Sequence, residues 1–398
     1  MKFRFLSPDT PIKESYLLIP RFSLRVVGCW PQRKVPTFIG ILHFLASSSA
    51  VAFGAFGECI AGALTLNQIL ETMEAWCPGV TKQISLFKMW IFFVHREKLY
   101  SMIERIEQLL TADSNEDKKK IAQKLSVIAS ILTVILFVSA NSTNLFFNTR
   151  PLINNIIRIS NGKNATLDLP FKMILPNVLT HYPVYPLTYI SMSYSGVMTV
   201  FTFCGVDGCF VGLCFYISAL FRMIQYDIQE LFGHLQYHEK AGRRDNQIMR
   251  QELKVIIRRH NEVIDLCNEF KDIFTTIIMG HFLSASLVVC FSVIDLLYNT
   301  GIGLVLYVCY SIAALSQLFL YCIGGTYVND SSLEICDSVY LVEWYKCDAE
   351  TRRMILMILI RAQRPATINV PFFTPSLPTF MGILSTTGSY IALMKSFL

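Results

Sequence analysis

The sequence predicts an all-α membrane protein with seven transmembrane helices, and three observations lead to this prediction: the composition, seven long apolar segments, and the placement of basic residues between them. Of the 398 residues, 53% are hydrophobic and 16% are charged, whereas soluble domains carry about 25% charged residues. The mean hydropathy is +0.44. The chain is therefore too apolar for an ordinary soluble domain. Its net charge is +6, but the distribution of the basic residues along the chain, described below, does not indicate nucleic-acid binding.

Seven segments are apolar over the length of about 20 residues that a helix needs to cross the hydrocarbon core. The second segment is the weakest because it contains Glu71, Glu74 and the Pro78-Gly79 break. The fourth is too long for one crossing, so we expect its second half to continue as a helix beyond the membrane. We expect one seven-helix domain over residues 1–398, with spans at 37–57, 61–94, 125–147, 185–221, 273–298, 302–323 and 377–398.

Basic residues alternate strongly between the connections. The amino-terminal segment and every second loop together hold 28 lysines and arginines, and the intervening loops hold 4. Because basic loops stay on the cytosolic side, we expect a cytosolic amino terminus and an extracellular carboxy terminus. The sequon that begins at Asn164 lies in a loop that this topology makes extracellular, so Asn164 is a candidate glycosylation site.

The basic segments 95–124 and 222–271 have helical periodicity and mixed charge. We therefore expect the spans to be extended by helices in the cytosol, which together form an anchor region below the membrane.

Motifs for catalysis are missing from the sequence. It contains no phosphate-binding loop, no nucleophile elbow and no paired-cysteine metal motif. His234 and His238 have the spacing of two metal ligands on a helix, but no third ligand is evident, so solvated histidines are the favoured interpretation. We expect neither an enzyme, nor a cofactor, nor a metal site.

Seven spans also raise the possibility of a G-protein-coupled receptor. The basic amino terminus opposes it, and the acidic-Arg-Tyr triplet and the N-P-x-x-Y motif of such receptors are missing. A transporter would show an inverted repeat with matching broken helices, and none is visible.

The last span carries hydroxyl groups along one helical stripe. These hydroxyls either pack against neighbouring helices or face water. In the second case they line a pore, with a leucine as a hydrophobic constriction that gates by dewetting. One helix cannot enclose a pore, so this interpretation requires an oligomer. The candidate pore-lining residues are Thr386, Ser389, Leu393 and Ser396.

Aromatic and small polar residues gather at the outer ends of the third and fourth spans. They form either an interfacial aromatic belt or an apolar pocket with a few hydroxyls, which is the usual lining for a small organic ligand. The candidate ligand-binding residues are Phe137, Asn141, Tyr185, Tyr189, Met192 and Ser193.

Two further features of the spans bear on packing. Gly208 and Gly212 have the spacing of a close helix crossing, and the neighbouring Asp207 is expected to reach the cytosolic interface. Glu71 and Glu74 require partners or water.

Several stretches resemble the insect chemoreceptor superfamily, and specifically its odorant receptors. The loop before the fourth span carries Leu169-Pro-Phe-Lys172, Pro176 and Pro183-x-Tyr185-x-x-x-Tyr189. The segment before the last span carries Glu343-Trp344-Tyr345, Arg352-Arg353 and Leu359-Ile-Arg361-Ala-Gln-Arg364-Pro365, followed by Phe372-Phe373 and Thr379-Phe380. Ser389-Tyr390, five residues and then Ser396-Phe397 is similar to the closing Thr-Tyr-x5-Gln-Phe signature, with departures at Ser389, Lys395 and Ser396.

The resemblance implies a tetrameric, ligand-gated, non-selective cation channel that binds small volatile organic molecules. It places this channel in the plasma membrane of olfactory sensory neurons, at the dendrite. It implies an odorant pocket among the outer halves of the helices and a pore lined by the last helix. The family's obligate co-receptor carries a long insertion between spans four and five, for which residues 222–271 leave no room. The resemblance therefore implies a ligand-tuning subunit that assembles with the co-receptor in membrane lipid, and a gustatory-type channel that works without a co-receptor is the alternative.

Overall fold

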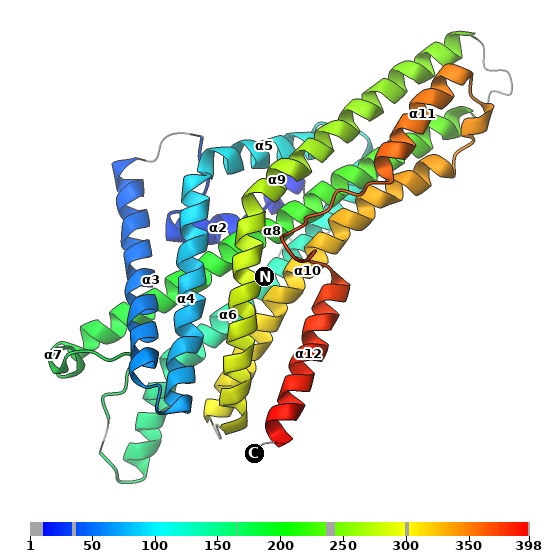
Figure 1. Ribbon diagram of the computed structural model, residues 1–398. Helices are drawn as coiled ribbons and strands as arrows, with labels where there is room; N and C mark the ends of the chain where they lie inside the picture. Colours follow the sequence, from blue (N-terminus) through cyan, green and yellow to red (C-terminus); the bar gives the residue numbers. More distant parts are fainter. Residues whose placement is uncertain (1–10, 34–36, 165, 236–242, 299–301, 397–398) are drawn as a thin grey trace.

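In the computed structural model the chain forms a bundle of long helices (Figure 1). The structure describes residues 11–33, 37–164, 166–235, 243–298 and 302–396. The elements are α1 (Ile12–Ser15), α2 (Leu18–Val27), α3 (Phe38–Leu64), α4 (Ile69–Val94), α5 (Arg96–Thr111), α6 (Glu116–Ser160), α7 (Asn177–Thr180), α8 (Tyr185–Leu235), α9 (Arg243–Tyr298), α10 (Ile302–Tyr340), the 3-10 turn η2 (Trp344–Lys346), α11 (Ala349–Ala362) and α12 (Leu377–Ser396). Within these residues β pairing is limited to one bridge between Val370 and Phe373.

The seven predicted spans correspond to seven helices, although the second span, 61–94, begins in the last turn of α3; the predicted all-α fold class is confirmed. Five helices, α3, α6, α8, α9 and α10, are long and apolar enough to cross a membrane by themselves. The other two spans correspond to α4 and α12. The charges of α4 reduce its apolarity, and they are matched inside the bundle, as described below. The turn between the first two helices lies at residues 65–68, later than the expected link at 58–60, because α3 continues to Leu64.

The helix α8 is the central element of the bundle. Of its most apolar stretch 94% is buried, whereas the corresponding stretches of the other four helices are 33% to 50% buried. It packs against α2, α3, α6, α9 and α10. The predicted close crossing at Gly208 and Gly212 is confirmed, because added Cβ atoms would lie 2.9 Å from Pro20, within α2, and 2.4 Å from Leu17, which directly precedes α2. Small residues on α8 thus let the amino-terminal helix lie directly on it.

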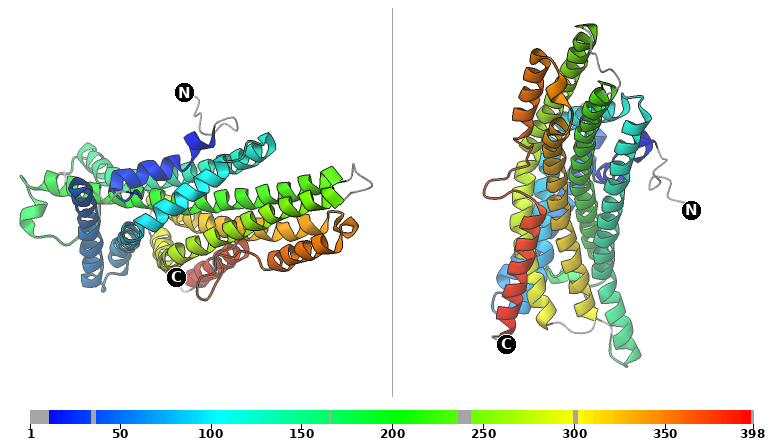
Figure 2. Two further views of the ribbon diagram at one scale, coloured as in Figure 1. Left: turned by 90° about the horizontal axis from the view of Figure 1, so that it is seen from above. Right: turned by 90° about the vertical axis from the view of Figure 1, so that its right-hand side faces the viewer.

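Four helices are far longer than one crossing requires, as expected for an anchor region. α6, α8, α9 and α10 have 45, 51, 56 and 39 residues, against about 20 for a span. Figures 1 and 2 show the carboxyl ends of α8 and α10, the start of α9 and the whole of α11 together at one end of the molecule, here called the α11 end. The α3–α4 turn and the end of α12 lie at the opposite end, here called the α3–α4 end.

Helix boundaries follow from local capping. The side chain of Asn115 accepts a hydrogen bond from the backbone N–H of Asp117 and so begins α6, whose first turn also holds Glu116. The side chain of Asp348 accepts from the backbone N–H of Thr351 at the start of α11. Such oxygens satisfy N–H groups that have no partner within the helix, and acidic groups in the first turn are favoured by the helix dipole.

Candidate functional site

A cavity lies among five helices, on the half of the bundle toward the α3–α4 end. The cavity encloses about 90 Å³, less than the roughly 150 Å³ of an engineered cavity that binds benzene. A ligand of that bulk therefore requires some lining side chains to move. The helices α4, α6, α8, α9 and α10 supply the walls, and Phe171 from the α6–α7 loop closes one side. The lining residues are Pro78, Thr81, Lys82, Ile84, Ala140, Thr143, Asn144, Phe147, Phe171, Gly196, Thr199, Val200, Phe203, His281, Ser284, Ala285, Val288, Tyr310, Ala313, Ala314 and Gln317.

Most of the cavity wall is apolar, and its hydroxyl groups are held by the main chain. Thr199 donates to the carbonyl of Ser195 at 2.8 Å, and Ser284 donates to the carbonyl of His281 at 2.9 Å. Tyr310 donates to the carbonyl of Cys77 at 3.0 Å and thereby connects α10 to α4. An apolar cavity with a few fixed polar groups is typical of a site for a small organic molecule.

One charged side chain of the cavity wall is Lys82, which the sequence analysis did not single out. It forms an ion pair with Glu58 of α3, and the two side chains are 3% and 0% exposed. The Lys82 ammonium also lies 3.6 Å from the ring centre of Phe171, a favourable cation–π arrangement. An added Cβ on Gly54 would lie 3.2 Å from the Lys82 ammonium, so the glycine leaves room for this buried charge.

A second buried ion pair lies directly beneath the cavity. Lys88 of α4 donates to Asp207 of α8 at 2.7 Å, and both side chains are fully buried. Tyr321 of α10 donates to the same carboxylate oxygen at 2.6 Å, and the Lys88 nitrogen lies 3.2 Å from Nδ1 of His281 on α9. The carboxylate joins α4, α8 and α10, and Lys88 extends the network to α9.

The expectation that Asp207 reaches the cytosolic interface is wrong. Asp207 is 0% exposed because α8 is the central helix, and its charge is balanced by Lys88 rather than by water. Isolated charges are costly in the membrane interior, so a lysine and an aspartate on different spans should be sought as a pair.

None of the six predicted ligand-binding residues is among the residues that line the cavity. Met192 packs in the cluster that contains Phe147 and Tyr310, and Phe137 packs in a small cluster with Ala140. The amide of Asn141 donates to the carbonyl of Phe137 at 2.7 Å. A ligand contact for these side chains stays a prediction.

The two predicted tyrosines and Ser193 lie farther toward the α6–α7 loop. Tyr185 donates to the carbonyl of Asp168 at 2.7 Å, and Tyr189 donates to the carbonyl of Asn148. Their rings lie 6.0 Å apart. They tie α8 to the loop and to α6, while the Ser193 hydroxyl is buried without a hydrogen-bond partner among the described residues.

Glu71 and Glu74 find their partners near the outer wall of the cavity. Glu74 forms ion pairs with Arg150 of α6 and with Lys172 of the α6–α7 loop, the latter at 3.1 Å. Glu71 lies 3.5 Å from the same lysine. These contacts hold Lys172 of the loop against α4. The preceding residue, Phe171, closes one side of the cavity.

The last helix leaves its predicted stripe uncovered within the single chain. Thr386 and Ser389 are exposed, and their hydroxyls donate to the carbonyls of Gly382 and Ser385 one turn earlier. The side chains of Leu393 and Ser396 lie outside the described residues. A pore-lining role for the four residues stays a prediction.

The remaining sequence candidates are at the surface or outside the described part. Asn164 is exposed, and the neighbouring Thr166 is held by the side chain of Asn155. His238 lies outside the described residues. In the described ranges no group of three or more metal-ligating side chains is found.

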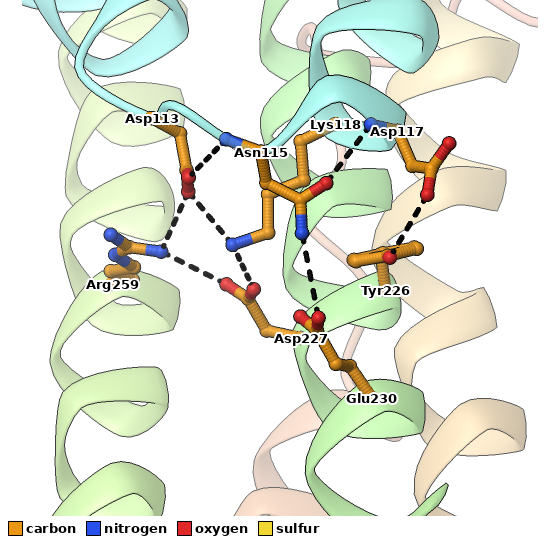
Figure 3. A network of polar contacts seen from close by, with 8 residues as sticks. All are labelled: Asp113, Asn115, Asp117, Lys118, Tyr226, Asp227, Glu230 and Arg259. Carbon is orange, nitrogen blue, oxygen red and sulfur yellow. Dashed lines mark hydrogen bonds and ion pairs between the residues drawn. The ribbon is translucent and has the colours of Figure 1, made fainter.

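A charge cluster joins three elements toward the α11 end (Figure 3). Lys118 at the start of α6 contacts Asp113 at 2.7 Å and also Asp227 of α8. Arg259 of α9 contacts Asp227 at 3.0 Å and Asp113 at 3.4 Å. Two cations thus share two carboxylates, and the α5–α6 turn is fixed against α8 and α9. Around them, Asn115 donates to Glu230 and Tyr226 donates to Asp117.

The cluster keeps its charges near neutral pH. Burial alone would raise the pKa of Asp113, but hydrogen bonds from Lys118 and from the backbone of Asn115 outweigh it and hold that pKa below its ordinary value. Burial would lower the pKa of Lys118, but its bonds to Asp113 and Asp227 raise it above the ordinary value. Both shifts favour the ion-paired form.

Contacts lead from the cavity to the start of α12. Phe282 follows His281 on α9, and its ring lies 4.5 Å from that of Phe373 in the segment before α12. On α10, Thr326 accepts a hydrogen bond from the backbone N–H of Leu377, the first residue of α12, at 3.0 Å. An added Cβ on the preceding Gly325 would lie 2.1 Å from the carbonyl oxygen of Pro375. α10 therefore both lines the cavity and holds the beginning of the last helix.

Known proteins similar to this chain fall in one group. The family profile described as 7tm Odorant receptor matches residues 68–388. Odorant receptor 22c of Drosophila melanogaster is 40% identical over 98% of this chain and 99% of its own length. Odorant receptor 10a of the same species is 37% identical over 99% of this chain and 98% of its own length.

Among solved structures, the insect olfactory receptor OR5 from Machilis hrabei in complex with eugenol has the same fold. It superposes with a TM-score of 0.79 over 97% of this chain and 98% of its own, at 15% sequence identity.

Proposed function

This chain belongs to the insect odorant receptor family, and we propose that it is the odorant-binding subunit of a ligand-gated cation channel whose binding site is the cavity among α4, α6, α8, α9 and α10. The observation that carries the proposal is the cavity itself: a buried, largely apolar space with a few fixed polar groups. Volatile ligands bind mainly by burying apolar surface, at about 25 cal/mol per Å², and such walls offer that surface.

We further propose that occupancy of the cavity reaches the pore through α10. Tyr310 and Ala314 of this helix line the cavity, while Gly325 and Thr326, about four turns later, contact the segment that begins α12. A ligand that moves α10 outward changes the position of Leu377 directly. Tightly packed helices respond to such displacements as units because their interfaces have discrete packed arrangements.

The partner proposed for this subunit is the family's co-receptor. Two features support it: residues 222–271 carry no long insertion, and the stripe of α12 that includes Thr386 and Ser389 is exposed in the single chain. Each subunit of a tetramer would contribute this stripe to one pore. The location proposed is the plasma membrane of olfactory sensory neurons, at the dendrite.

The topology proposed places the α3–α4 end outside and the α11 end in the cytosol. The 28-to-4 distribution of basic residues supports it. Replacing Asn164 by Gln should then remove a glycan and increase the mobility of the protein on a denaturing gel. Unchanged mobility, together with labelling of an amino-terminal epitope on intact cells, would contradict the orientation.

A cavity-filling substitution tests the proposed site. Ala314 is buried in the cavity wall, so Ala314→Phe should occupy the space and lower the response to odorants at least tenfold. Ala46 is exposed on α3, and Ala46→Phe is the matched control that should change nothing. Both variants are expressed with the co-receptor, and odorant-evoked current is compared with the current evoked by a co-receptor agonist.

Overpacking can destabilise a core by about 1–3 kcal/mol, so a second variant protects the test. Val200→Ala enlarges the cavity and should shift potency toward bulkier members of a homologous odorant series. If Ala314→Phe reaches the surface and responds to odorants with the dose dependence of the unsubstituted receptor, the cavity is not the odorant site.

A further inference from the structure

One buried side chain in the cavity wall holds a polar atom that the rest of the described bundle leaves without a partner. His281 lines the cavity and is 2% exposed. Its Nδ1 lies 3.2 Å from the ammonium of Lys88, whereas its Nε2 is buried with no hydrogen-bond partner among the described residues. Lys88 itself does not line the cavity. The Nδ1 side of the imidazole ring therefore faces the Lys88–Asp207 network and not the cavity.

The neighbours of His281 determine which nitrogen carries the proton. The Lys88 ammonium is a donor only, and it is held by Asp207 at 2.7 Å, so the imidazole must accept at Nδ1. A neutral imidazole that accepts at one nitrogen carries its proton on the other. The Nε2 atom is therefore an N–H donor, fixed in direction by a lysine and aspartate that the ligand does not touch.

The buried hydroxyl groups of the wall have already used their protons. Thr143, Thr199 and Tyr310 each donate to a main-chain carbonyl, at 3.0, 2.8 and 3.0 Å. The ammonium of Lys82 is paired with Glu58 and lies against an aromatic ring. Among the neutral, nine-tenths-buried lining side chains that the structure describes, His281 thus differs in having a donor with no acceptor.

We propose that His281 is a specificity-determining residue of the odorant site, whose Nε2–H donates a hydrogen bond to an acceptor oxygen of the ligand. This inference rests on the proposed function of the cavity. The ligand class is a small, mainly apolar molecule with one carbonyl, ester or ether oxygen. A hydrocarbon of the same shape leaves the buried donor unpaired, and sites built around a polar group reject analogues that lack the matching group. Lys88 and Asp207 act as positioning residues.

Matched pairs of volatiles test the proposal in the complete channel. The probes are 2-heptanone with 2-methyl-1-heptene, and anisole with ethylbenzene, in which a methylene group replaces the oxygen. We expect the oxygenated member to be about tenfold more potent in the unsubstituted receptor, as loss of one buried hydrogen bond implies. Current is recorded with the co-receptor present and normalised to a co-receptor agonist.

Variants then assign the preference to one side chain. His281→Phe and His281→Met have no donor and should bring each pair to equal potency, and either of them suffices if the other fails to reach the surface. His281→Gln presents an amide N–H close to the Nε2 position and should keep most of the preference. His43 is an exposed histidine of α3, and His43→Phe is the control that should keep all of it.

Three results would overturn the proposal: equal potency within both pairs in the unsubstituted receptor, an unchanged preference in a donorless variant, or no response to any oxygenated probe. Failure of the underlying site assignment gives a different pattern. If the cavity is not the odorant site, Ala314→Phe leaves responses intact. If it is the site but His281 is not the donor, Ala314→Phe abolishes them while His281→Phe keeps the preference.

Discussion

Removing Lys88 should destabilise the receptor far more than removing a lysine from its surface. Lys88 and Asp207 are both fully buried and 2.7 Å apart, so Lys88→Met leaves a carboxylate inside the bundle with only the Tyr321 hydroxyl as partner. Breaking a buried ion pair by deleting one member costs about 3–5 kcal/mol. Folded proteins are stable by about 5–15 kcal/mol in total, so the loss is a large fraction of the whole.

The structure also predicts which second substitution restores stability. Asp207→Asn removes the charge and keeps an oxygen that accepts the hydrogen bond from Tyr321, which the aspartate accepts at 2.6 Å. Alone, it leaves the Lys88 ammonium without its anion. Combined with Lys88→Met, it leaves no charge unpaired, so the double variant should be more stable than either single variant.

Thermal unfolding of the detergent-purified receptor and surface labelling of cells measure these effects. At 3–5 kcal/mol, the ratio of folded to unfolded protein falls by roughly two to four orders of magnitude in each single variant. Lys119→Met is the matched control, because Lys119 pairs with Glu116 on an exposed face and its loss should matter little. If Lys88→Met costs no more than Lys119→Met, or if the double variant is the least stable, the buried-pair reasoning is refuted.

Three further outcomes are expected. Burial lowers the pKa of His260, in the extended part of α9, to about 4, whereas the pKa in the unfolded chain is about 6.5. Between these values the unfolded chain binds a proton that the folded chain does not bind. The free energy of unfolding should therefore fall by up to about 3 kcal/mol as the pH drops from 6.5 to 4. Thermal unfolding against pH should show a flatter profile for His260→Gln, and identical profiles would contradict the assignment. Gly325→Ala forces a Cβ to within 2.1 Å of the Pro375 carbonyl oxygen and should change the maximal odorant current. Gly233→Ala places its Cβ where nothing lies within 4 Å and should not change it. Equal maximal currents in the two variants would contradict the route through α10. Cysteines on the pore stripe should react with soluble thiol reagents, and uniform reactivity around α12 would mean that the stripe packs against protein. The stripe positions for this test are Thr386, Ser389, Leu393 and Ser396.

Hydropathy and charge were enough to predict the long helices. The seven spans are long apolar segments, and the bundle reproduces them because each must satisfy its own backbone hydrogen bonds in lipid. The long fourth segment correctly indicated a helix that continues beyond the span, which became α8. Glycine spacing also correctly indicated the close crossing at Gly208 and Gly212.

Charges inside the spans held information that the sequence analysis did not use. Of the 35 lysines and arginines, only Lys82, Lys88 and Lys395 fall within predicted spans. Since an unpaired charge is costly in lipid, Lys82 and Lys88 each required a carboxylate on another helix. Asp207, Asp295 and Glu58, which follows the first predicted span, were the acids available in or beside other spans. Which acid pairs with which base depends on helix packing, and the sequence does not contain that information directly.

The position of the cavity could not be predicted because α6 and α8 are apolar on most sides. The predicted residues Phe137 and Asn141 lie on the same helix as Ala140 and Asn144, which line the cavity, but they are on a neighbouring face. An amphipathic helix shows its buried face through its periodicity, whereas a helix that is apolar all round does not. Which face borders the cavity depends on how the helices pack against α8, which runs obliquely through the bundle (Figure 1).

Protection of an introduced cysteine by bound odorant shows whether the odorant occupies the cavity among α4, α6, α8, α9 and α10. Val200 is buried and lines the cavity, so Val200→Cys places a thiol of similar size where the ligand should lie. A small membrane-permeant thiol reagent is applied to the channel with and without saturating odorant, and the unsubstituted receptor controls for its twelve natural cysteines. We expect that modification suppresses odorant-evoked current and that bound odorant slows the modification severalfold. Modification at the same rate in the presence of odorant would contradict the claim that the odorant occupies this cavity.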